Sequence, residues 1–430
     1  MEKCNCTINL AAGLVLFTAS LMLIAPVAVP AQAVVVPSGA GTSESPYLIS
    51  EIGHLVWMSD NAGSSSGKYY TMTADIDASA TAEWNDNGTD TSILEGFKPI
   101  GTYSYPDTTS FRGIFDGAGH TISGLVILRS AANDIGLFGY IGPSGGVGNL
   151  GLIGGAVTGH SSVGGLAGGN DDSGTVSNCY VTGAVTGTGS YVGGLVGGDN
   201  EGTVSNCHAT GTVTATGSST KSIGGLVGSN LGTVSNSYAT CAVKGTGSGF
   251  VGGLVGENWY GTVSNCYSTG AVTAESYVGG LIGNSYASTV SNCYSTGLVT
   301  GSVPAGGLIG FKISGTVSSS YWNTQTSGKT SSSGGTGKDT TQMKQQATFT
   351  GWDFTSVWGI VEGMTYPFLP VATIAGDVNG DFSVNTSDLE LVLGSLDKSS
   401  GEIGYSTQTD LDHDGTITST DLSIVLTNME

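Results

Sequence analysis

The sequence predicts a mainly β protein: a right-handed parallel β-helix, or β-solenoid, with capping segments, followed by a small all-α module. Three observations lead to this prediction. Residues 148–321 repeat every 27 to 31 residues and contain no helix-length amphipathic run. Glycine supplies 72 of the 430 residues without a collagen period. Residues 376–430 contain one acidic twelve-residue pattern twice, each copy followed by an apolar helical stretch.

The first 33 residues have the pattern of a secretory signal peptide. Lys3 gives a charged start, residues 10–25 form an apolar core, and Ala31-Gln32-Ala33 matches a cleavage site. An uncleaved membrane anchor is the alternative, because the apolar stretch is near the lower length limit for spanning a bilayer. Two prolines and the cleavage site favour removal. We therefore expect a secreted, extracellular protein without a membrane span after cleavage.

Residues 34–147 are predicted to hold an N-terminal cap and the first coils of the solenoid. Ser50 is a candidate N-cap for a short helix with an apolar side at Leu55 and Trp57. A terminal coil needs such a cover because an open β-edge pairs with other chains. At the other end, residues 322–375 are predicted to be a C-terminal cap and linker, with aromatic residues from 352 to 369 covering the far end of the solenoid.

The repeat between 148 and 321 has the consensus V-G-G-L-V-G-x-N-x-G-T-V-S-N-C-Y-S-T-G-x-V-T. Short β-branched runs separated by Gly, Asn and Thr predict three short strands per unit, joined by tight turns. One unit cannot bury its own apolar face, but stacked units can, so each repeat is predicted to be one coil. Adjacent coils are expected about 4.8 Å apart.

The asparagine of T-V-S-N-C-Y is predicted to bend the chain. On a straight strand Val263 and Cys266 would point to opposite faces, but a left-handed conformation at Asn265 lets both face the interior. The cysteines of this register would then be an interior ladder of unpaired thiols, because stacked Cβ vectors suit disulfide geometry badly. They are Cys179, Cys207, Cys266 and Cys293. Cys241 lies out of register, and exposure is the expectation for it.

This repeat resembles the GLUG motif of secreted bacterial proteins, which often lies beside IgA1-specific metallopeptidases. The resemblance covers about six copies. A zincin-type peptidase needs H-E-x-x-H, and none of the five histidines is followed by Glu. The resemblance therefore implies the solenoid and not the peptidase activity.

Charged residues are rare in the repeats, with six Asp or Glu and three Lys between 148 and 321. Most of the acidic residues share one turn position with a set of asparagines, which predicts turn-forming residues on a solvated edge. A carboxylate pair for sugar chemistry is the alternative, because adjacent coils bring these side chains together. The two sets are Asp171, Asp172, Asp199, Glu201 and Glu257, and Asn170, Asn200, Asn230 and Asn258.

Aromatic residues recur in three registers of the repeat. Such ladders usually stabilise the solenoid, and one that faces solvent is a candidate platform for a sugar or a protein. The registers are Tyr180, His208, Tyr238, Tyr267, Tyr294 and Tyr321; Tyr191, Phe250 and Tyr277; and Trp259, Tyr260 and Tyr286 near the acidic turn.

The two acidic loops, 377–388 and 410–421, have oxygen-bearing side chains at positions 1, 3, 5 and 12, as an EF-hand loop does. This spacing predicts two Ca²⁺ sites. The first set of ligands is Asp377, Asn379, Asp381, Asp388 and the Ser383 carbonyl; the second is Asp410, Asp412, Asp414, Asp421 and the Thr416 carbonyl. Position 6 favours φ > 0, so Phe382 in the first loop is expected to make that site weaker than the second, which has Gly415.

Residues 376–430 resemble a type I dockerin, the module that binds a cohesin on a scaffold protein. In that family loop positions 10 and 11 contribute heavily to recognition. They correspond to Thr386 and Ser387 in the first copy and to Ser419 and Thr420 in the second. The resemblance therefore implies a cohesin partner bound through these four residues.

The charge distribution excludes some other partners. The net charge is −21, and residues 376–430 hold 11 Asp or Glu against one Lys. Because the sequence has no basic cluster, nucleic acid is not expected as a ligand.

These observations predict a secreted, non-catalytic modular protein. Its solenoid would provide a surface for adhesion or for binding glycans or proteins, and its dockerin would attach it to a cohesin-bearing assembly, at the cell surface where such an assembly lies there. The alternative is a polysaccharide-degrading glycoside hydrolase or lyase of a cellulosome-like complex. The sequence singles out no catalytic residues.

Overall fold

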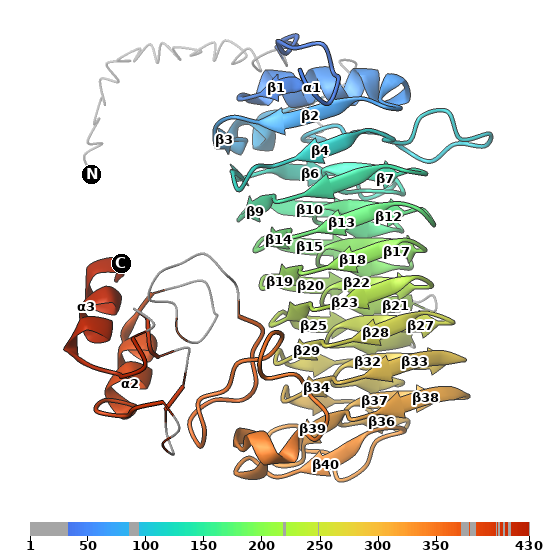
Figure 1. Cartoon of the computed structure of the whole chain (residues 1–430). Coiled ribbons are helices and arrows are strands. Elements are labelled where there is room, and N and C mark those ends of the chain that lie inside the picture. Colours follow the sequence, from blue (N-terminus) through green and yellow to red (C-terminus); the bar gives the residue numbers. More distant parts are fainter. Residues whose placement is uncertain are drawn as a thin grey trace, which may run out of the picture.

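The computed structural model describes residues 33–85, 94–217, 221–247, 249–370, 378, 384–400, 402, 405–406, 409–411 and 414–429. The predicted signal peptide lies outside these residues apart from Ala33. The chain forms a parallel β-solenoid whose coils stack along one axis, followed by two short helices (Figure 1). Within the described residues no helix has the length and apolar character to cross a membrane.

A coil of the repeat region contains five short strands. In the coil that begins at residue 175 these are β13 (Thr175–Ser177), β14 (Tyr180–Val181), β15 (Ala184–Gly187), β16 (Val192–Gly193) and β17 (Val196–Asn200). The prediction of three strands per unit is therefore wrong. Equivalent strands of successive coils pair in parallel, and this pairing produces five sheets, here named A to E.

The strands of each sheet have the following bounds. Sheet A contains β1 (Tyr47–Ile49), β2 (Tyr69–Met72), β4 (Ile114–Asp116), β8 (Gly146–Gly148), β13, β18 (Thr203–Ser205), β23 (Thr233–Ser235), β28 (Thr262–Ser264), β33 (Ser288–Ser291) and β38 (Gly315–Ser318). Sheet B contains β3 (Ile76–Asp77), β5 (Thr121–Ser123), β9 (Gly151–Ile153), β14, β19 (His208–Ala209), β24 (Tyr238–Ala239), β29 (Tyr267–Ser268), β34 (Tyr294–Ser295), β39 (Tyr321–Asn323) and β40 (Thr336–Lys338). Sheet C contains β6 (Val126–Leu128), β10 (Ala156–Gly159), β15, β20 (Thr212–Ala215), β25 (Ala242–Gly245), β30 (Val272–Thr273) and β35 (Val299–Thr300). Sheet D contains β7 (Phe138–Ile141), β12 (Ala167–Asn170), β17, β22 (Val227–Asn230), β27 (Val255–Trp259), β32 (Ile282–Tyr286) and β37 (Ile309–Lys312). Sheet E contains β11 (Val163–Gly164), β16, β21 (Lys221–Gly224), β26 (Gly249–Gly252), β31 (Val278–Gly279) and β36 (Ala305–Gly306).

The G-G-L segment explains the additional strands. A Cβ atom on Gly193 would lie 2.0 Å from the carbonyl oxygen of Val196, and one on Gly194 would lie 2.2 Å from that of Gly225. The backbones of sheets D and E approach so closely that only glycine fits between them. The V-G-G-L-V-G sequence therefore forms two short strands where the β-branched pattern suggested one.

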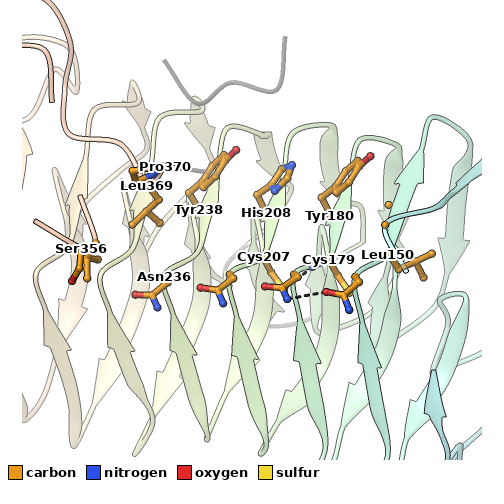
Figure 2. Close-up of a pocket in the computed structure, with 16 residues that line it drawn as sticks. Leu150, Cys179, Tyr180, Cys207, His208, Asn236, Tyr238, Ser356, Leu369 and Pro370 are labelled. Carbon is orange, nitrogen blue, oxygen red and sulfur yellow. Dashed lines mark hydrogen bonds between the residues drawn. The ribbon is translucent and has the colours of Figure 1, made fainter. Parts of the chain in front are cut away.

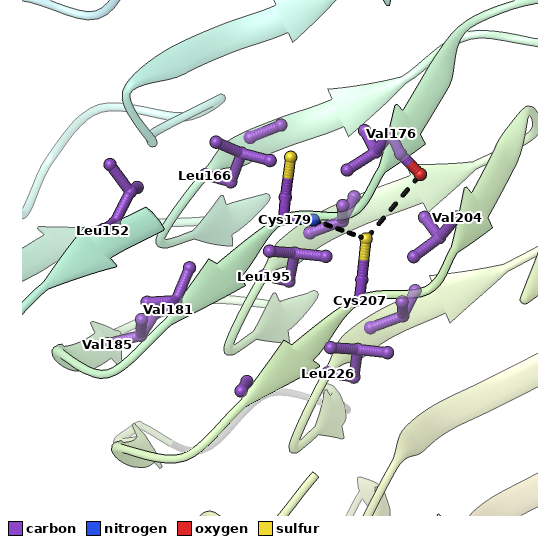
Figure 3. Close-up of a cluster of buried hydrophobic side chains, with 14 of the residues drawn as sticks. Leu152, Leu166, Val176, Cys179, Val181, Val185, Leu195, Val204, Cys207 and Leu226 are labelled. Carbon is purple, nitrogen blue, oxygen red and sulfur yellow. Dashed lines mark hydrogen bonds between the residues drawn. The ribbon is translucent and has the colours of Figure 1, made fainter. Parts of the chain in front are cut away.

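The predicted bend at the repeat asparagine is confirmed. Asn265 has φ +52°, and both Val263 and Cys266 are completely buried. The asparagines of this register that adopt the left-handed conformation are Asn149, Asn178, Asn206, Asn236, Asn265 and Asn292. Figure 3 shows the result around Cys179 and Cys207, whose thiols lie among the valines and leucines of neighbouring coils.

All five cysteines of the solenoid are buried and unpaired. The expectation that Cys241 is exposed is wrong, since it is 1% exposed. Cys241 takes the position of Gly211 in the preceding coil, directly before sheet C. Its thiol lies within the core, with Sγ 3.4 Å from the carbonyl oxygen of Gly225.

We expect the ladder thiols to resist alkylation in the folded protein and to react once it is denatured. Burial raises the pKa of Cys207 and Cys266 well above the usual value of a thiol and that of Cys241 to about 12, so the reactive thiolate is scarce. Mass spectrometry after iodoacetamide treatment, with and without denaturant, measures the labelling. Rapid native labelling of the four ladder cysteines, or disulfides between them, would contradict the interior assignment.

The turn asparagines are a buried ladder, which corrects the prediction that they lie on a solvated edge. Asn170, Asn200, Asn230 and Asn258 are 0% exposed. Each of the first three donates from Nδ2 to Oδ1 of the next, at 2.7 to 2.8 Å. An amide carries donor and acceptor on one side chain, so identical rungs satisfy one another.

The acidic residues beside this ladder differ in exposure. Asp172, Asp199 and Glu201 are exposed, as predicted for a solvated edge. Glu257 is 6% exposed. It accepts hydrogen bonds from Ser222 at 3.2 Å and from Asn284 at 3.0 Å.

Capping segments flank the coils. The predicted N-terminal helix is α1 (Ile52–Asn61), but its N-cap is Glu51 and not Ser50. The C-terminal strap, which we define as residues 340–370, contains two short 3₁₀ turns and packs on sheet B along the flank of the solenoid. The prediction that its aromatic residues cover the far end is wrong, because they pack against the row of tyrosines on that flank. The cluster consists of Tyr238, Tyr267, Tyr294, Tyr321, Met343, Phe349, Trp352, Trp358, Ile360 and Leu369.

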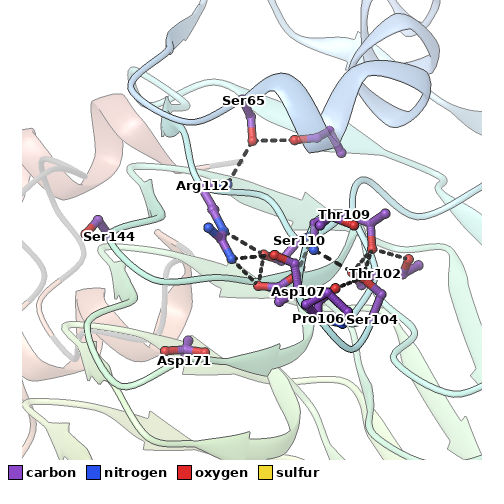
Figure 4. Close-up of polar contacts among 12 residues, drawn as sticks. Ser65, Thr102, Ser104, Pro106, Asp107, Thr109, Ser110, Arg112, Ser144 and Asp171 are labelled. Atoms are coloured by element: carbon purple, nitrogen blue, oxygen red, sulfur yellow. Dashed lines mark hydrogen bonds and ion pairs between the residues drawn. The ribbon is translucent and has the colours of Figure 1, made fainter.

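One exposed loop, residues 101–111, is held in place from its base (Figure 4). The Arg112 guanidinium donates to the Asp107 carboxylate at 2.8 Å and to its carbonyl oxygen at 2.9 Å. Tyr105, near the tip, is 93% exposed.

Candidate functional site

The first aromatic register forms a continuous stack on the outside of sheet B (Figure 2). From Tyr180 through His208, Tyr238 and Tyr267 to Tyr294, ring centroids are 4.7 to 5.1 Å apart and interplanar angles are 4 to 8°. Each ring face therefore covers the next, which leaves no face for a sugar. This register stabilises the coils.

A cavity of about 650 Å³ lies beside this stack where the strap ends (Figure 2). Tyr180 and His208 of the stack line it, as do Leu369 and Pro370 of the strap. Exposed asparagines of the left-handed register, among them Asn206, line it as well. The cavity is thus polar along one side and apolar at the strap.

We expect His208 to make the stability of the solenoid depend on pH. Burial lowers its pKa to about 3, whereas the unfolded chain has a pKa of about 6.5. As the pH falls from 6.5 towards 3, the imidazole of His208 becomes protonated in the unfolded state and stays neutral in the folded state. The free energy of unfolding should fall by up to about 1.4 kcal/mol per pH unit.

The matched variant is His208→Tyr, which introduces the residue that Tyr180 and Tyr238 supply in the neighbouring coils. It should lose this part of the pH dependence and keep the contribution of the carboxylates. Urea unfolding of both proteins at pH 7 and pH 4 provides the comparison. Equal losses of stability in the two proteins would contradict the assignment.

In the second acidic loop the structure describes three of the predicted side-chain ligands, Asp410, Asp414 and Asp421. Asp410 is 2% exposed and accepts from the hydroxyl of Tyr405 at 2.6 Å. Asp421 is 0% exposed and accepts from the backbone N–H groups of Leu411 and Thr418, at 2.6 and 2.8 Å. These bonds close the loop around its carboxylates.

The remaining parts of this loop follow the predicted pattern. Asp414 accepts from the backbone and the hydroxyl of Thr416, at 2.8 and 2.6 Å. Gly415, at loop position 6, has φ +88°, a conformation that glycine adopts without strain. Asp412 lies outside the described residues.

In the first loop Asp388 is the predicted side-chain ligand that the structure describes. It is 0% exposed and accepts from the backbone N–H groups of Val378 and Asn385, at 2.8 and 3.0 Å. Asp388 thus occupies the same place as Asp421. The other predicted ligands of this loop, and the residue at position 6, lie outside the described part: Asp377, Asn379, Asp381, Ser383 and Phe382.

A helix begins directly after position 9 of each loop. These helices are α2 (Thr386–Gly394) and α3 (Ser419–Asn428), and their N-caps are Asn385 and Thr418. The two helices pack together over a small core that includes Val392 and Val425. The predicted recognition residues are the first two of each helix, and all four are exposed: Thr386, Ser387, Ser419 and Thr420.

Tyr405 is hydrogen-bonded to Asp410, the first carboxylate of the second loop. Its hydrogen bond to Asp410, with the charges of Asp410, Asp414 and Asp421, raises the pKa of Tyr405 to about 12. Within the described residues no three His, Cys, Asp or Glu side chains are grouped closely enough to hold a metal. Buried carboxylates on a loop with a left-handed glycine are nevertheless the donor type that Ca²⁺ prefers, and the described residues fit that ion chemically.

Family models match both repeated parts of the chain. The model of the dockerin type I domain matches residues 375–429. The GLUG motif matches residues 159–186, 188–214, 247–273 and 274–300, four of the copies predicted from the repeat. The chain carries a type I dockerin and GLUG repeats. The dockerin implies calcium binding and attachment to a cohesin-bearing assembly.

Two related proteins match this chain over only part of their length. Halomucin of Haloquadratum walsbyi is 42% identical over 147 residues, which are 34% of this chain and 2% of that protein. A Gly-rich membrane protein of Evansella cellulosilytica is 36% identical over 143 residues, which are 33% of this chain and 15% of that protein. The chain therefore spans a small fraction of these relatives.

Two solved structures align with the GLUG-bearing chain. One is a crystal structure described as an immunoglobulin A1 protease from Bacteroides ovatus, with a TM-score of 0.48 and 21% identity, covering 77% of this chain and 94% of that one. The other is an IgA1 protease, with a TM-score of 0.47 and 16% identity, covering 82% of this chain and 27% of that one. The protease activity in these names describes those two proteins and is not assigned to this chain.

Sequence reasoning missed Tyr405 in the dockerin. Its hydroxyl donates to Asp410 at loop position 1, although it lies outside the twelve-residue pattern. The available signal was an aromatic residue five positions before the second loop. The loop motif assigns no role to that position.

Proposed function

We propose that this protein is a secreted, non-catalytic component of a cohesin-bearing assembly. Its dockerin binds two Ca²⁺ ions and docks onto a cohesin, and its solenoid provides a surface for adhesion or for binding a glycan or a protein. The observation that carries the proposal is the duplicated loop and helix, in which a buried aspartate at position 12 precedes exposed hydroxyl residues at the helix start.

Each calcium ion would be held by the ligands of one loop. Asp388 and Asp421 occupy equivalent places and have equivalent backbone partners, which supports two sites of the same construction. The ligands are Asp377, Asn379, Asp381, Asp388 and the Ser383 carbonyl in the first site, and Asp410, Asp412, Asp414, Asp421 and the Thr416 carbonyl in the second. The recognition surface is Thr386, Ser387, Ser419 and Thr420.

Attachment has a direct test. The full chain should be retained on immobilised cohesin modules of the source organism when Ca²⁺ is present, and released when a chelator is added. Retention that persists after the chelator is added, or no retention on any cohesin, would contradict the proposed attachment role.

A polysaccharide-degrading enzyme is the second candidate, and one observation favours it. Partial burial, followed by the charges of Asp199, Asp171 and Asp172, raises the pKa of the exposed Glu201. A carboxyl group whose pKa is raised by burial and by neighbouring carboxyl groups is the arrangement of a general acid. Release of reducing sugar that disappears in Glu201→Gln would establish this role, and binding of the same polysaccharide without sugar release would support the non-catalytic one.

A further inference from the structure

The third aromatic register forms an exposed cluster at one corner of the solenoid, where β27 and β32 end. Trp259 and Tyr260 are 43% and 64% exposed. The ring centroid of Tyr286 lies 5.1 Å from that of Trp259 and 5.4 Å from that of Tyr260. Tyr286 is half-buried, so it supports the two outer rings from the next coil.

One residue of this cluster, Tyr260, has a strained backbone conformation. Tyr260 has φ +60° and Ala287, at the next corner, has φ +49°. A bulky L-residue in the left-handed region costs about 1–2 kcal/mol, and such strain is concentrated at functional sites. In the two preceding coils glycine follows the corner residue directly, as Gly202 and Gly232. Compared with those coils, this corner has one extra residue, Tyr260, which has the strained conformation and an exposed ring.

Apolar side chains extend the cluster to four successive coils. The pairing of Asn230 with Asn258 places Leu231 beside Trp259. The pairing of Ser285 with Lys312 places Ile313 beside Tyr286. Leu231 and Ile313 are 38% and 59% exposed. We name the set Leu231, Trp259, Tyr260, Tyr286 and Ile313 the aromatic corner.

Charge around the aromatic corner disfavours an anionic ligand. In the two coils before Leu231 the same row carries Glu201 and, before it, Asp171. Lys312 lies in the neighbouring row, level with Ser285, and donates from its ammonium group to the carbonyl oxygen of Gly315 at 3.1 Å. A polymer of uronate or sulfate groups, or a nucleic acid, would meet repulsion along this row.

The size of the aromatic corner disfavours a protein partner. A fully buried aromatic side chain contributes about 150–250 Å², and these rings are only partly exposed. The exposed area therefore stays below the roughly 800 Å² per partner that a stable protein interface needs. The rings are tilted by 58° and 90° between Tyr286 and its two neighbours. A small cluster of exposed rings with phenol and indole groups suits a few sugar units, which have an apolar ring face and a rim of hydroxyl groups.

We propose that the aromatic corner binds a neutral polysaccharide chain running along the solenoid axis. This inference rests on the proposed role of the solenoid as a binding surface and names its ligand class and location. Trp259 and Tyr286 lie in successive coils with ring centroids 5.1 Å apart, a spacing comparable to the length of one sugar ring in an extended chain. Stacking on Trp259 and Tyr260 supplies affinity, and the phenol hydroxyls supply hydrogen bonds.

The test is native affinity electrophoresis of the full chain in gels containing soluble β-glucan, arabinoxylan, galactomannan or dextran, with carboxymethylcellulose as the anionic arm. At least one neutral polysaccharide should retard the wild-type protein, and Trp259→Ala and Tyr260→Ala should each weaken binding about tenfold or more. The matched control is Tyr105→Ala, which removes a more exposed ring (93%) from the 101–111 loop and should bind like the wild type. Circular dichroism melting verifies that every variant is folded.

The outcomes separate this inference from the proposed function. Retardation that survives Trp259→Ala and Tyr260→Ala would overturn the location while the solenoid remained a glycan-binding surface. Retardation by carboxymethylcellulose alone would overturn the neutral-ligand class. No retardation in any gel would overturn the inference, and calcium-dependent retention on cohesin would then still support the attachment role. A self-association lost in Trp259→Ala would identify a second copy as the occupant in place of a glycan.

Discussion

Removal of calcium is expected to unfold the dockerin and to leave the solenoid folded. Asp410 and Asp421 are 2% and 0% exposed and share their loop with Asp412 and Asp414, so like charges repel when no cation is bound. The solenoid depends on valine, leucine and amide ladders, which need no ion. At a free calcium concentration about 1,000 times Kd, each bound ion stabilises the folded dockerin by about 4 kcal/mol.

Thermal unfolding followed by circular dichroism measures this effect. The helical transition should move to lower temperature on chelation, while the β transition should stay in place. Asp421→Ala should reproduce the effect of chelator on one site. Asp172→Ala, at an exposed carboxylate of the solenoid, is the control and should change neither transition. An unchanged helical signal after chelation would rule out calcium-linked folding.

The two sites are expected to differ in strength. Gly415 has φ +88° at loop position 6, and the first loop has Phe382 at that position. A bulky residue resists this conformation, so Asp410→Ala should lower calcium affinity more than Asp377→Ala does.

Features determined by neighbouring residues could be predicted from the sequence. The left-handed Asn265 followed from parity within six residues, because Val263 and Cys266 had to face one core. The capping boxes at Asn385 and Thr418 follow in the same way from a loop that ends in Asp three residues later. In both cases one local backbone conformation satisfies the whole pattern.

Features determined by contacts between coils could not be predicted. Asn230 was expected on a solvated edge because asparagine favours turns, yet each amide pairs with the amide one coil away. Cys241 was expected to be exposed because it lies out of register with the other cysteines. Its side chain is instead buried in the core beside Gly225. The path of the strap depends on its packing against Tyr294, which donates a hydrogen bond to the carbonyl oxygen of Pro367.

The candidate site shows the same division. The loop motif predicted which residues carry oxygen ligands, since ligand spacing is local. Exposure of Trp259 and Tyr260 depends on the corner at which their coil turns. The position of these residues in the repeat did not indicate whether their rings face the core or the solvent. A motif can therefore name ligands, whereas a surface needs the fold.

Alanine at the helix starts of both copies is expected to abolish capture by a cohesin, whereas alanine in one copy should weaken it little. The changed residues are Thr386, Ser387, Ser419 and Thr420, all of them exposed. The two loop–helix copies have equivalent caps and equivalent buried aspartates, so either can present the recognition surface. Loss of both pairs should reduce affinity about a hundredfold or more.

These substitutions separate recognition from folding because the capping groups stay in place. The side chains of Asn385 and Thr418 accept from the backbone N–H groups of Ser387 and Thr420, at 2.8 and 3.1 Å, and alanine keeps those donors. Ser423→Ala, at an exposed hydroxyl further along α3, is the matched control and should bind normally. Surface plasmon resonance on immobilised cohesin, with calcium and then with chelator, measures each variant. Full binding by the fourfold variant would place recognition elsewhere on the dockerin, and a large loss from a single pair would show that only one copy docks.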